Sequence, residues 1–177
     1  VYSTVSGIIK EIMVEEGDTI RKGTPLIVLS NDAAELSTEN ARLAAEYSAA
    51  SNKTDRLEEL KAGIEIAERK YKNDSTLYDR QKNLWSEGIG TKNELDQREL
   101  ASQTSKKNYE IAVRRYNEVR KEIEFIAKQS RKNLQINTSL QKDFTLRSEV
   151  DGMVFSILRE KGEIVSPQMP VAVIGNA

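Results

Sequence analysis

The sequence predicts an α+β chain in which a small β-sandwich, or flattened barrel, is interrupted once by a long antiparallel coiled-coil α-hairpin. Three observations support this prediction. The two ends of the 177-residue chain repeat each other at a constant offset. The segment between them contains no proline and carries a seven-residue apolar pattern. With 31% charged and 38% hydrophobic residues, the chain is also more polar than a compact globule, as expected of an elongated helix pair.

The repeat defines the predicted β domain. Residues 7–17 align with residues 152–162, and the later matches, which include two prolines, keep the same offset of 145 residues. Each half alternates apolar and polar side chains and is rich in β-branched residues, which is typical of short strands. One half alone cannot bury both faces of its strands, so residues 1–31 and 146–177 are expected to form one domain. The glycines expected at its structural turns are Gly7, Gly17, Gly152 and Gly162.

The insert, residues 32–145, is predicted to be the helical hairpin. Its first half has apolar or aromatic residues seven positions apart, as in the seam of a coiled coil. These residues are Leu36, Leu43, Ala50, Leu57, Ile64, Tyr71, Tyr78 and Trp85. The second half has two such phases, which hold Leu95, Tyr109, Tyr116 and Ile123 in one and Ala112, Val119 and Ile126 in the other. Two helices of ~50 residues would give a hairpin ~75 Å long.

Helix-end signals mark where the hairpin starts and where it turns. The segment Asp32–Glu35 has the acidic N-cap and the glutamate spacing of a capping box, and Thr91–Glu94 has the full Thr-x-x-Glu pattern. Between the two predicted helices lie Gly88 and Gly90, which can end a helix and reverse the chain. We therefore expect the hairpin tip near residues 86–91.

The composition excludes several classes of function. The chain has no histidine and no cysteine, which excludes imidazole catalysis, thiol chemistry, disulfides and Cys/His zinc sites. Most of its 28 acidic residues are expected to be solvated i,i+4 partners on charged helices, and nothing in their pattern indicates a catalytic pocket. We therefore expect no catalytic residue, no metal and no cofactor. The net charge of −1 also argues against a nucleic-acid partner, which would require a basic face.

The repeated half, with its Gly-x9-Gly-Asp/Glu spacing and a proline before the last strand, resembles the lipoyl/biotinyl domain. A lipoyl domain split at its centre by a helical hairpin resembles the HlyD-like membrane fusion proteins, the periplasmic adaptors of efflux pumps and type I secretion systems. The resemblance covers essentially the whole chain. It implies a lipoyl-plus-hairpin fragment of such an adaptor, with a split lipoyl-like β-sandwich and a role in transport that involves no chemistry.

The expected tip carries a second resemblance. Many adaptors that dock on TolC-like outer-membrane channels have an arginine, a leucine four residues later and a serine seven residues after that. Arg80, Leu84 and Thr91 match this pattern, with threonine in place of serine. The arginine fork and the hydroxyl can bond to a partner, and Trp85 and Ile89 would add apolar contact. The structural alternative is a solvated arginine, apolar side chains that cover the end of the seam, and a threonine that only caps a helix.

The resemblance also implies partners and a location. The expected partners are a TolC-like outer-membrane channel, an inner-membrane transporter of the ABC or RND class reached through domains absent from this chain, and further copies of the chain in a ring, with six as the family expectation. The expected location is the periplasm of a Gram-negative cell, with an inner-membrane anchor in a segment outside this chain. Gln168, whose counterpart in the first half is Gly23, is a candidate lining residue of the channel; an exposed turn is the alternative.

Two other functions compete with the adaptor role. A true lipoyl or biotinyl carrier needs an acceptor lysine in a tight hairpin between the two halves, and here the insertion replaces that turn. A coiled-coil tether without a transport role shares the helical pattern but does not explain the split β repeat.

Overall fold

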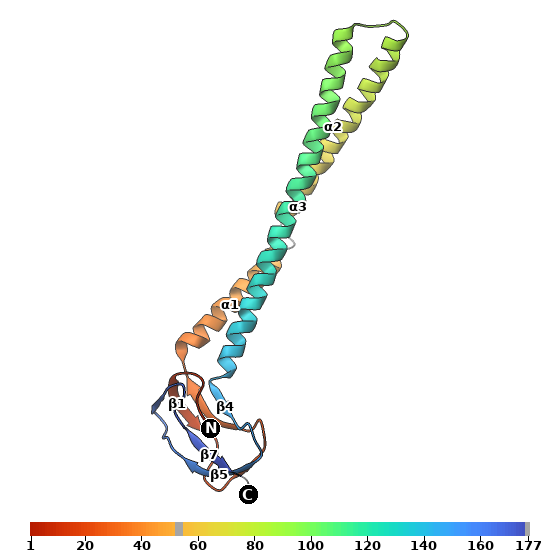
Figure 1. Cartoon of the computed structure of the whole chain (residues 1–177). Coiled ribbons are helices and arrows are strands. Elements are labelled where there is room, and N and C mark those ends of the chain that lie inside the picture. Colours follow the sequence, from red (N-terminus) through yellow and green to blue (C-terminus); the bar gives the residue numbers. More distant parts are fainter. Residues whose placement is uncertain (52–54, 176–177) are drawn as a thin grey trace. The chain divides into compact units, whose positions relative to one another are not determined.

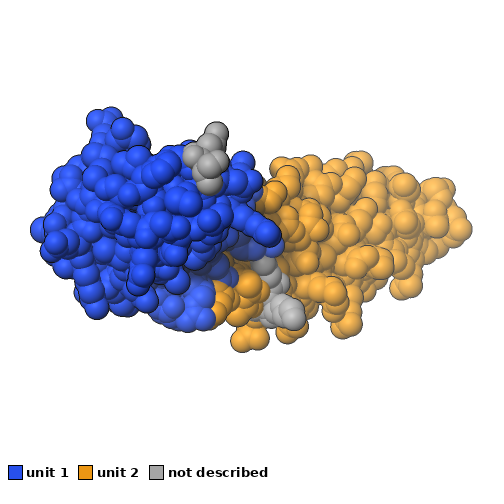
Figure 2. Space-filling view, turned by 90° about the horizontal axis from the view of Figure 1, so that it is seen from below, with its two compact units in different colours: residues 1–45, 129–177 blue, residues 46–128 orange. Residues whose placement is uncertain are grey.

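The computed structural model describes residues 1–51 and 55–175 (Figure 1). The strands are β1 (Gly7–Ile12), β2 (Thr19–Ile20), β3 (Pro25–Ser30), β4 (Thr145–Arg147), β5 (Gly152–Ile157), β6 (Ile164–Val165) and β7 (Ala172–Gly175). The helices are α1 (Asp32–Ser51), α2 (Asp55–Ser86) and α3 (Lys92–Lys142). The chain forms two compact units (Figure 2): unit 1 comprises residues 1–45 and 129–177, and unit 2 comprises residues 46–128. The α+β class with a split β domain and a long helical hairpin is confirmed.

Two antiparallel sheets make up the β part of unit 1. The larger has the order β4-β3-β1-β6 and the smaller has the order β2-β5-β7. Each sheet therefore combines strands from both halves of the repeat, which is why neither half can form the domain alone. Between the sheets lies a core of branched aliphatic side chains, of which the most deeply buried are Ile9, Leu26, Ile27, Val154, Val165 and Val171, each at most 1% exposed.

The repeat is reproduced hydrogen bond by hydrogen bond. The amide of Gly17 donates to the carbonyl of Val154 at 2.8 Å, and the amide of Gly162 donates to the carbonyl of Ile9 at 2.9 Å. Both bonds map onto each other at the offset of 145 residues seen in the sequence. The two halves are thus related by an approximate twofold symmetry that exchanges β1 with β5 and β2 with β6.

The four glycines that recur in the two halves of the repeat have two different roles. Gly17 and Gly162 lie in turns with φ of 97° and 93°, a conformation that glycine adopts without steric cost. The prediction that Gly7 and Gly152 lie in turns is wrong, because they begin β1 and β5. A Cβ atom on Gly152 would lie 2.3 Å from the carbonyl oxygen of Gly175. Gly152 therefore requires glycine because neighbouring backbone approaches closely, whereas a Cβ atom on Gly7 would make tight contacts of 3.1 Å to Leu29 Cβ and 3.2 Å to the carbonyl oxygen of Ser30.

The helical start at α1 corrects one cap. The side chain of Asn31 accepts the amide of Ala34 at 3.2 Å, so Asn31 is the N-cap and Asp32 is the first helical residue. Asparagine is at least as good an N-cap as aspartate, and the acidic Asp32 still lies favourably at the positive end of the helix.

The predicted seam is wrong in α1. Leu36 and Leu43 are 70% and 54% exposed, whereas the small residues Ala41 and Ala45 are buried. In unit 1, α1 meets α3 through polar contacts as well: Asn137 accepts a hydrogen bond from the Ser37 hydroxyl at 2.8 Å. Between α1 and α2 the predicted first helix of the hairpin passes through residues 52–54, which lie outside the described residues.

The predicted seams hold better in unit 2. Leu57, Ile64, Tyr71 and Tyr78 of α2 are at least partly buried, as are Leu95, Tyr109, Ala112, Tyr116, Val119 and Ile123 of α3. The rings of Tyr71 and Tyr109 stack with centroids 6.3 Å apart. The exceptions are Ala50 and Trp85 of the first arm, which are exposed, and Ile126 of α3, which is 44% exposed while its neighbour Ala127 is 5% exposed.

Pairing between the arms explains why one continuous pattern fails. Thr38 contacts Asn137 in unit 1, and Tyr71 stacks on Tyr109 in unit 2. Between these pairings the first arm advances 33 residues from Thr38 to Tyr71, but α3 advances only 28 from Tyr109 to Asn137. Five extra residues in the first arm change which face meets α3, although the seven-residue spacing in the sequence runs on unbroken.

Candidate functional site: the hairpin tip

The end of α2 is closed by a Schellman motif. The amide of Gly88 donates to the carbonyl of Trp85, and the amide of Ile89 donates to the carbonyl of Leu84, both at 2.9 Å. Gly88 has φ of 81°, the left-handed conformation that this helix ending requires. Gly88 is therefore the residue that makes the predicted turn possible. The two hydrogen bonds satisfy carbonyl groups at the end of α2 that would otherwise lack partners.

The start of α3 is closed by a full capping box. Thr91 Oγ1 accepts the amide of Glu94 at 3.2 Å, while Glu94 Oε2 accepts the amide of Thr91 at 2.9 Å. These reciprocal bonds satisfy two amides at the helix N-terminus. The Schellman motif fixes one end of the tip loop by bonds between backbone groups. The capping box fixes the other end by bonds between backbone amides and side-chain oxygens.

Gln81 is a tip residue that sequence reasoning missed. Gly90 has φ of 91°, and a Cβ atom built on it would lie 2.6 Å from Gln81 Nε2. The Gln81 amide of α2 therefore lies directly against the loop backbone at Gly90. The signal available in the sequence was a polar residue at a seam position one turn before the helix end, which alone does not distinguish a loop support from a solvated side chain.

The docking candidates lie at this end of the hairpin with different exposures. Arg80 is exposed and, among the described residues, forms no ion pair. Leu84 follows one turn later on α2 and is partly buried. Trp85 and Ile89 are 41% and 53% exposed. Thr91 is exposed, but its hydroxyl oxygen already serves the capping box. The tip thus presents a cation from the end of α2 and apolar area from both α2 and the loop that follows it.

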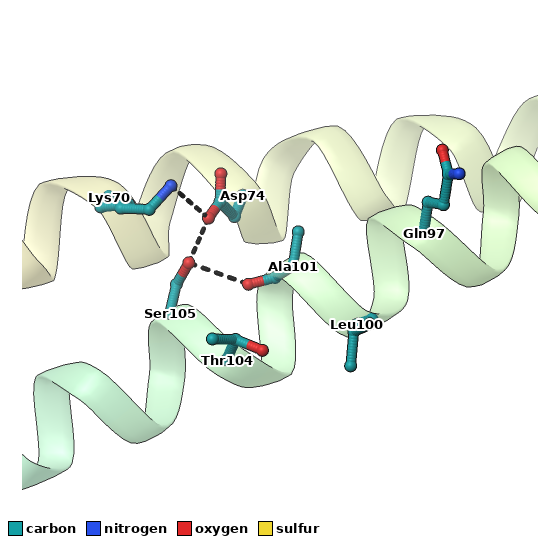
Figure 3. A pocket seen from close by; sticks show the side chains of 7 residues that line it. All are labelled: Lys70, Asp74, Gln97, Leu100, Ala101, Thr104 and Ser105. Atoms are coloured by element: carbon teal, nitrogen blue, oxygen red, sulfur yellow. Dashed lines mark hydrogen bonds and ion pairs between the residues drawn. The ribbon is translucent and has the colours of Figure 1, made fainter.

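A polar layer lies in the seam of unit 2 below the tip (Figure 3). The Ser105 hydroxyl of α3 bonds to the Asp74 carboxylate of α2, and Lys70 Nζ lies 3.2 Å from the same oxygen. The hydrogen bond from Ser105, aided by the Lys70 charge, holds the pKa of Asp74 below its ordinary value although burial opposes the shift. Asp74 and Ser105 are 8% and 2% exposed, so this carboxylate lies inside the helix pair.

The second candidate position, Gln168, lies in unit 1. It has φ of 71° and is the single residue other than glycine with positive φ among those described. The backbone amide of Gln168 donates to the carbonyl of Ser3 at 3.1 Å. Its repeat counterpart, Gly23, has φ of 89°. The turn geometry is therefore shared by both halves, and only the second half places an exposed polar side chain on it.

The described residues contain no group of acidic side chains arranged to hold a metal ion. None of the helices in the described part of the chain combines the length and the apolar character needed to cross a membrane.

Comparison with known proteins places the fold. The family model described as YknX, barrel-sandwich hybrid domain, matches residues 1–175. The periplasmic adaptor protein EmrA is similar in structure, with a TM-score of 0.58 and 17% identity over 99% of this chain and 71% of EmrA. The soluble domain of LipC, a membrane fusion protein of a type I secretion system, has a TM-score of 0.56 and 16% identity over 100% of this chain and 98% of that one.

A third solved structure, MacA from Actinobacillus actinomycetemcomitans, has a TM-score of 0.50 and 18% identity over 100% of this chain. The chain spans 48% of that MacA chain. No curated protein matches the sequence. At these identities the solved structures establish the fold, and the family model covers nearly the whole sequence. The chain belongs to the YknX barrel-sandwich hybrid domain family, and it shares its fold with solved membrane fusion proteins, as the resemblance of its repeat and hairpin implied.

Proposed function

We propose that the chain is the lipoyl-and-hairpin part of a periplasmic adaptor that joins an inner-membrane ABC or RND transporter to a TolC-like outer-membrane channel. In this role the protein seals an enclosed path through contacts and carries out no catalysis. The transporter supplies the energy. In this proposal, the contact with the transporter and the inner-membrane anchor both belong to segments outside this chain. The similarity to EmrA, a periplasmic adaptor, and to LipC, a type I secretion membrane fusion protein, supports this proposal.

The observation that carries the docking role is the composition of the tip. Arg80 has no ion-pair partner among the described residues, and Trp85 and Ile89 expose apolar surface at the same end of the hairpin. Exposed apolar groups that cluster at one end of a hairpin indicate a partner surface. A guanidinium fork next to them suits carboxylates or carbonyl oxygens of that partner.

The test uses paired variants with matched controls. Arg80→Asp and Leu84→Ala should each weaken site-specific crosslinking to the outer-membrane channel and reduce drug resistance or secretion, while far-UV circular dichroism stays unchanged. The controls are Arg69→Asp and Ile66→Ala, two exposed residues of α2 farther from the tip. Normal transport by the Arg80→Asp, Leu84→Ala double variant would eliminate the docking role.

Self-association is supported by two exposed stripes in unit 1. Leu36 and Leu43 lie on the side of α1 opposite its buried alanines, and Ile136 and Leu140 are 58% and 50% exposed on α3. Charge also differs between the two stripes. The first turn of α1 carries the acidic side chains Asp32 and Glu35, whereas the charge of Glu39 is paired with Arg42. The last turns of α3 carry only basic charged residues, namely Arg131, Lys132 and Lys142. Unlike stripes of opposite charge suit head-to-tail contacts in a ring, with six copies as the family expectation.

Disulfide trapping tests this contact, because the chain has no native cysteine. Copies in a ring share one height, so residues level within one hairpin are level between neighbours. Thr38 lies level with Asn137 in unit 1, which places Leu36 level with Ser139, one residue before Leu140. A mixture of Leu36→Cys and Leu140→Cys chains should therefore form intermolecular disulfides. Leu36→Cys with Ile111→Cys is the control, since Ile111 lies on the order of 40 Å farther along α3. Equal yields from both mixtures would contradict the ring.

We further propose that Gln168 lines the conduit of the assembled ring. The exposed side chain and the positive φ at this one position motivate the proposal, because residues held in an unfavourable conformation are often functional. Gln168→Ala should alter transport without altering ring assembly. Unchanged transport would support the alternative of an exposed turn. A mass shift on any lysine after native expression would instead indicate a lipoyl or biotinyl carrier.

A further inference from the structure

The seam of unit 2 is ambiguous in its apolar part. Tyr71 of α2 stacks on Tyr109 of α3, but Tyr116 lies one heptad farther along α3 and is also partly buried in the seam. Sliding α3 by seven residues along α2 would exchange the Tyr71–Tyr109 pair for a Tyr71–Tyr116 pair, although the short tip loop would lose the Thr91–Glu94 capping box. The seven-residue spacing of the aromatic pairs therefore does not by itself fix the register.

The polar layer removes this ambiguity. Asp74 faces Ser105 in the observed register, and its carboxylate receives the Ser105 hydroxyl and the Lys70 ammonium (Figure 3). After the seven-residue slide, Asp74 would face Ala112, which offers no side-chain donor. The carboxylate would keep Lys70 of its own helix but would lose its donor from α3, and a polar group that is 8% exposed is destabilised when it loses a hydrogen bond. A slide in the opposite direction would place Tyr71 against Ser102 and so lose the aromatic stack.

We propose that Asp74 and Ser105 form a register lock that fixes how far α3 is displaced along α2. The lock matters at the tip because the docking candidates come from both arms. Arg80 and Leu84 end α2, whereas Thr91 precedes α3, so their relative height depends on the register. This consequence rests on the proposed docking function, but the lock itself does not. Asp74 and Ser105 are thus positioning residues that never need to touch the partner.

Disulfide trapping within one chain measures the register directly, since every thiol is introduced. Counting one layer from Tyr71–Tyr109 places Ala67 level with Ala112, so the Ala67→Cys, Ala112→Cys pair reports the observed register. The Ala67→Cys, Val119→Cys pair reports the register slid by one heptad. With Asp74 present, the first pair should oxidise readily and the second should remain reduced, as read by mass spectrometry of tryptic peptides.

The decisive variant is Asp74→Leu in both cysteine backgrounds. It converts the layer to an apolar one, and the single Ser105 hydroxyl proton can then be donated to the carbonyl oxygen of Ala101, 2.8 Å away. The fraction of slid-register disulfide should rise about tenfold, because the carboxylate that loses its α3 donor in the slid register is gone. Helicity should be retained, since an apolar residue suits a seam position. No rise in this disulfide would overturn the lock.

Two comparisons separate the lock from general destabilisation and from docking. Asp74→Asn keeps an oxygen acceptor for Ser105 and should retain the observed register, whereas the exposed control Asp79→Leu should change nothing. If Asp74→Asn slid as far as Asp74→Leu, the hydrogen bond would not be the cause and the proposal would be wrong. If Asp74→Leu slides while crosslinking to the outer-membrane channel stays normal, the lock stands and the docking function of the tip fails.

Discussion

Replacing Thr91 separates its helix-capping role from its proposed docking role. Its hydroxyl oxygen accepts the amide of Glu94 at 3.2 Å, and Thr91→Ala removes that bond. Loss of an N-cap of this kind should cost about 1 kcal/mol of hairpin stability. The remaining bond, from the Thr91 amide to Glu94 at 2.9 Å, does not need the Thr91 side chain. In a chain of this size the expected fall in Tm is about 2–4 °C, measured by far-UV circular dichroism.

Two further variants at Thr91 distinguish the roles. Asparagine caps a helix as well as threonine but has no hydroxyl, whereas serine retains both features. If docking uses the hydroxyl, Thr91→Asn should keep the wild-type Tm and lose crosslinking to the channel, and Thr91→Ser should keep both. Full crosslinking by Thr91→Asn would refute the docking role of this hydroxyl. An unchanged Tm for Thr91→Ala would refute the capping argument itself.

Other substitutions test the backbone and the buried carboxylate. Gln168→Gly should raise stability by about 0.5–1 kcal/mol, because relief of the left-handed conformation, about 1–2 kcal/mol, exceeds the added freedom of the unfolded chain; a lower Tm would contradict it. Gly90→Ala should cost about 1–2 kcal/mol at φ of 91°, and adding Gln81→Ala should remove the steric part alone. Gly63→Ala, in open space within α2, should instead stabilise by about 1 kcal/mol in thermal melts. Since the pKa of Asp74 is lowered by folding, its ionised form stabilises the protein above the unfolded pKa of about 3.9, and this contribution disappears as the pH falls further. The Tm difference between wild type and Asp74→Asn should therefore stay constant from neutral pH to about pH 5 and shrink below about pH 4; a difference that grew in acid would contradict this assignment.

The sequence contained enough information for the β domain and the tip because both depend on local signals. Repeated glycines and prolines at one offset constrain backbone conformation directly, and the Thr91–Glu94 box uses bonds between residues three positions apart. The roles of Gly7 and Gly152 were misassigned because close approach between strands is a tertiary fact. A glycine looks the same in the sequence whether it turns the chain or admits a neighbour.

The helical seam shows where local reasoning ends. Leu36 and Leu43 continue the seven-residue pattern of α2, yet they are exposed because five extra residues separate the two pairings with α3. Periodicity gives the phase within one helix but not the alignment of two arms. The same limit hid the Asp74–Ser105 layer, since those residues are 31 positions apart in the sequence. Without knowledge of its partner on α3, an aspartate such as Asp74 appears only as a break in the apolar pattern of the seam.

The root of the hairpin has a consequence for how such chains can change. Strand β3 pairs with β4 through Val28 and Thr145, and the amide of Leu29 donates to the carbonyl of Phe144 at 2.6 Å. The outgoing and returning segments are therefore clamped together by sheet hydrogen bonds just before α1 begins and just after α3 ends. Arm length is then a free variable of the architecture, because residues added in matched numbers to both arms leave this clamp and the twofold sandwich untouched. A related chain can reach across a wider or narrower gap by changing its arms alone.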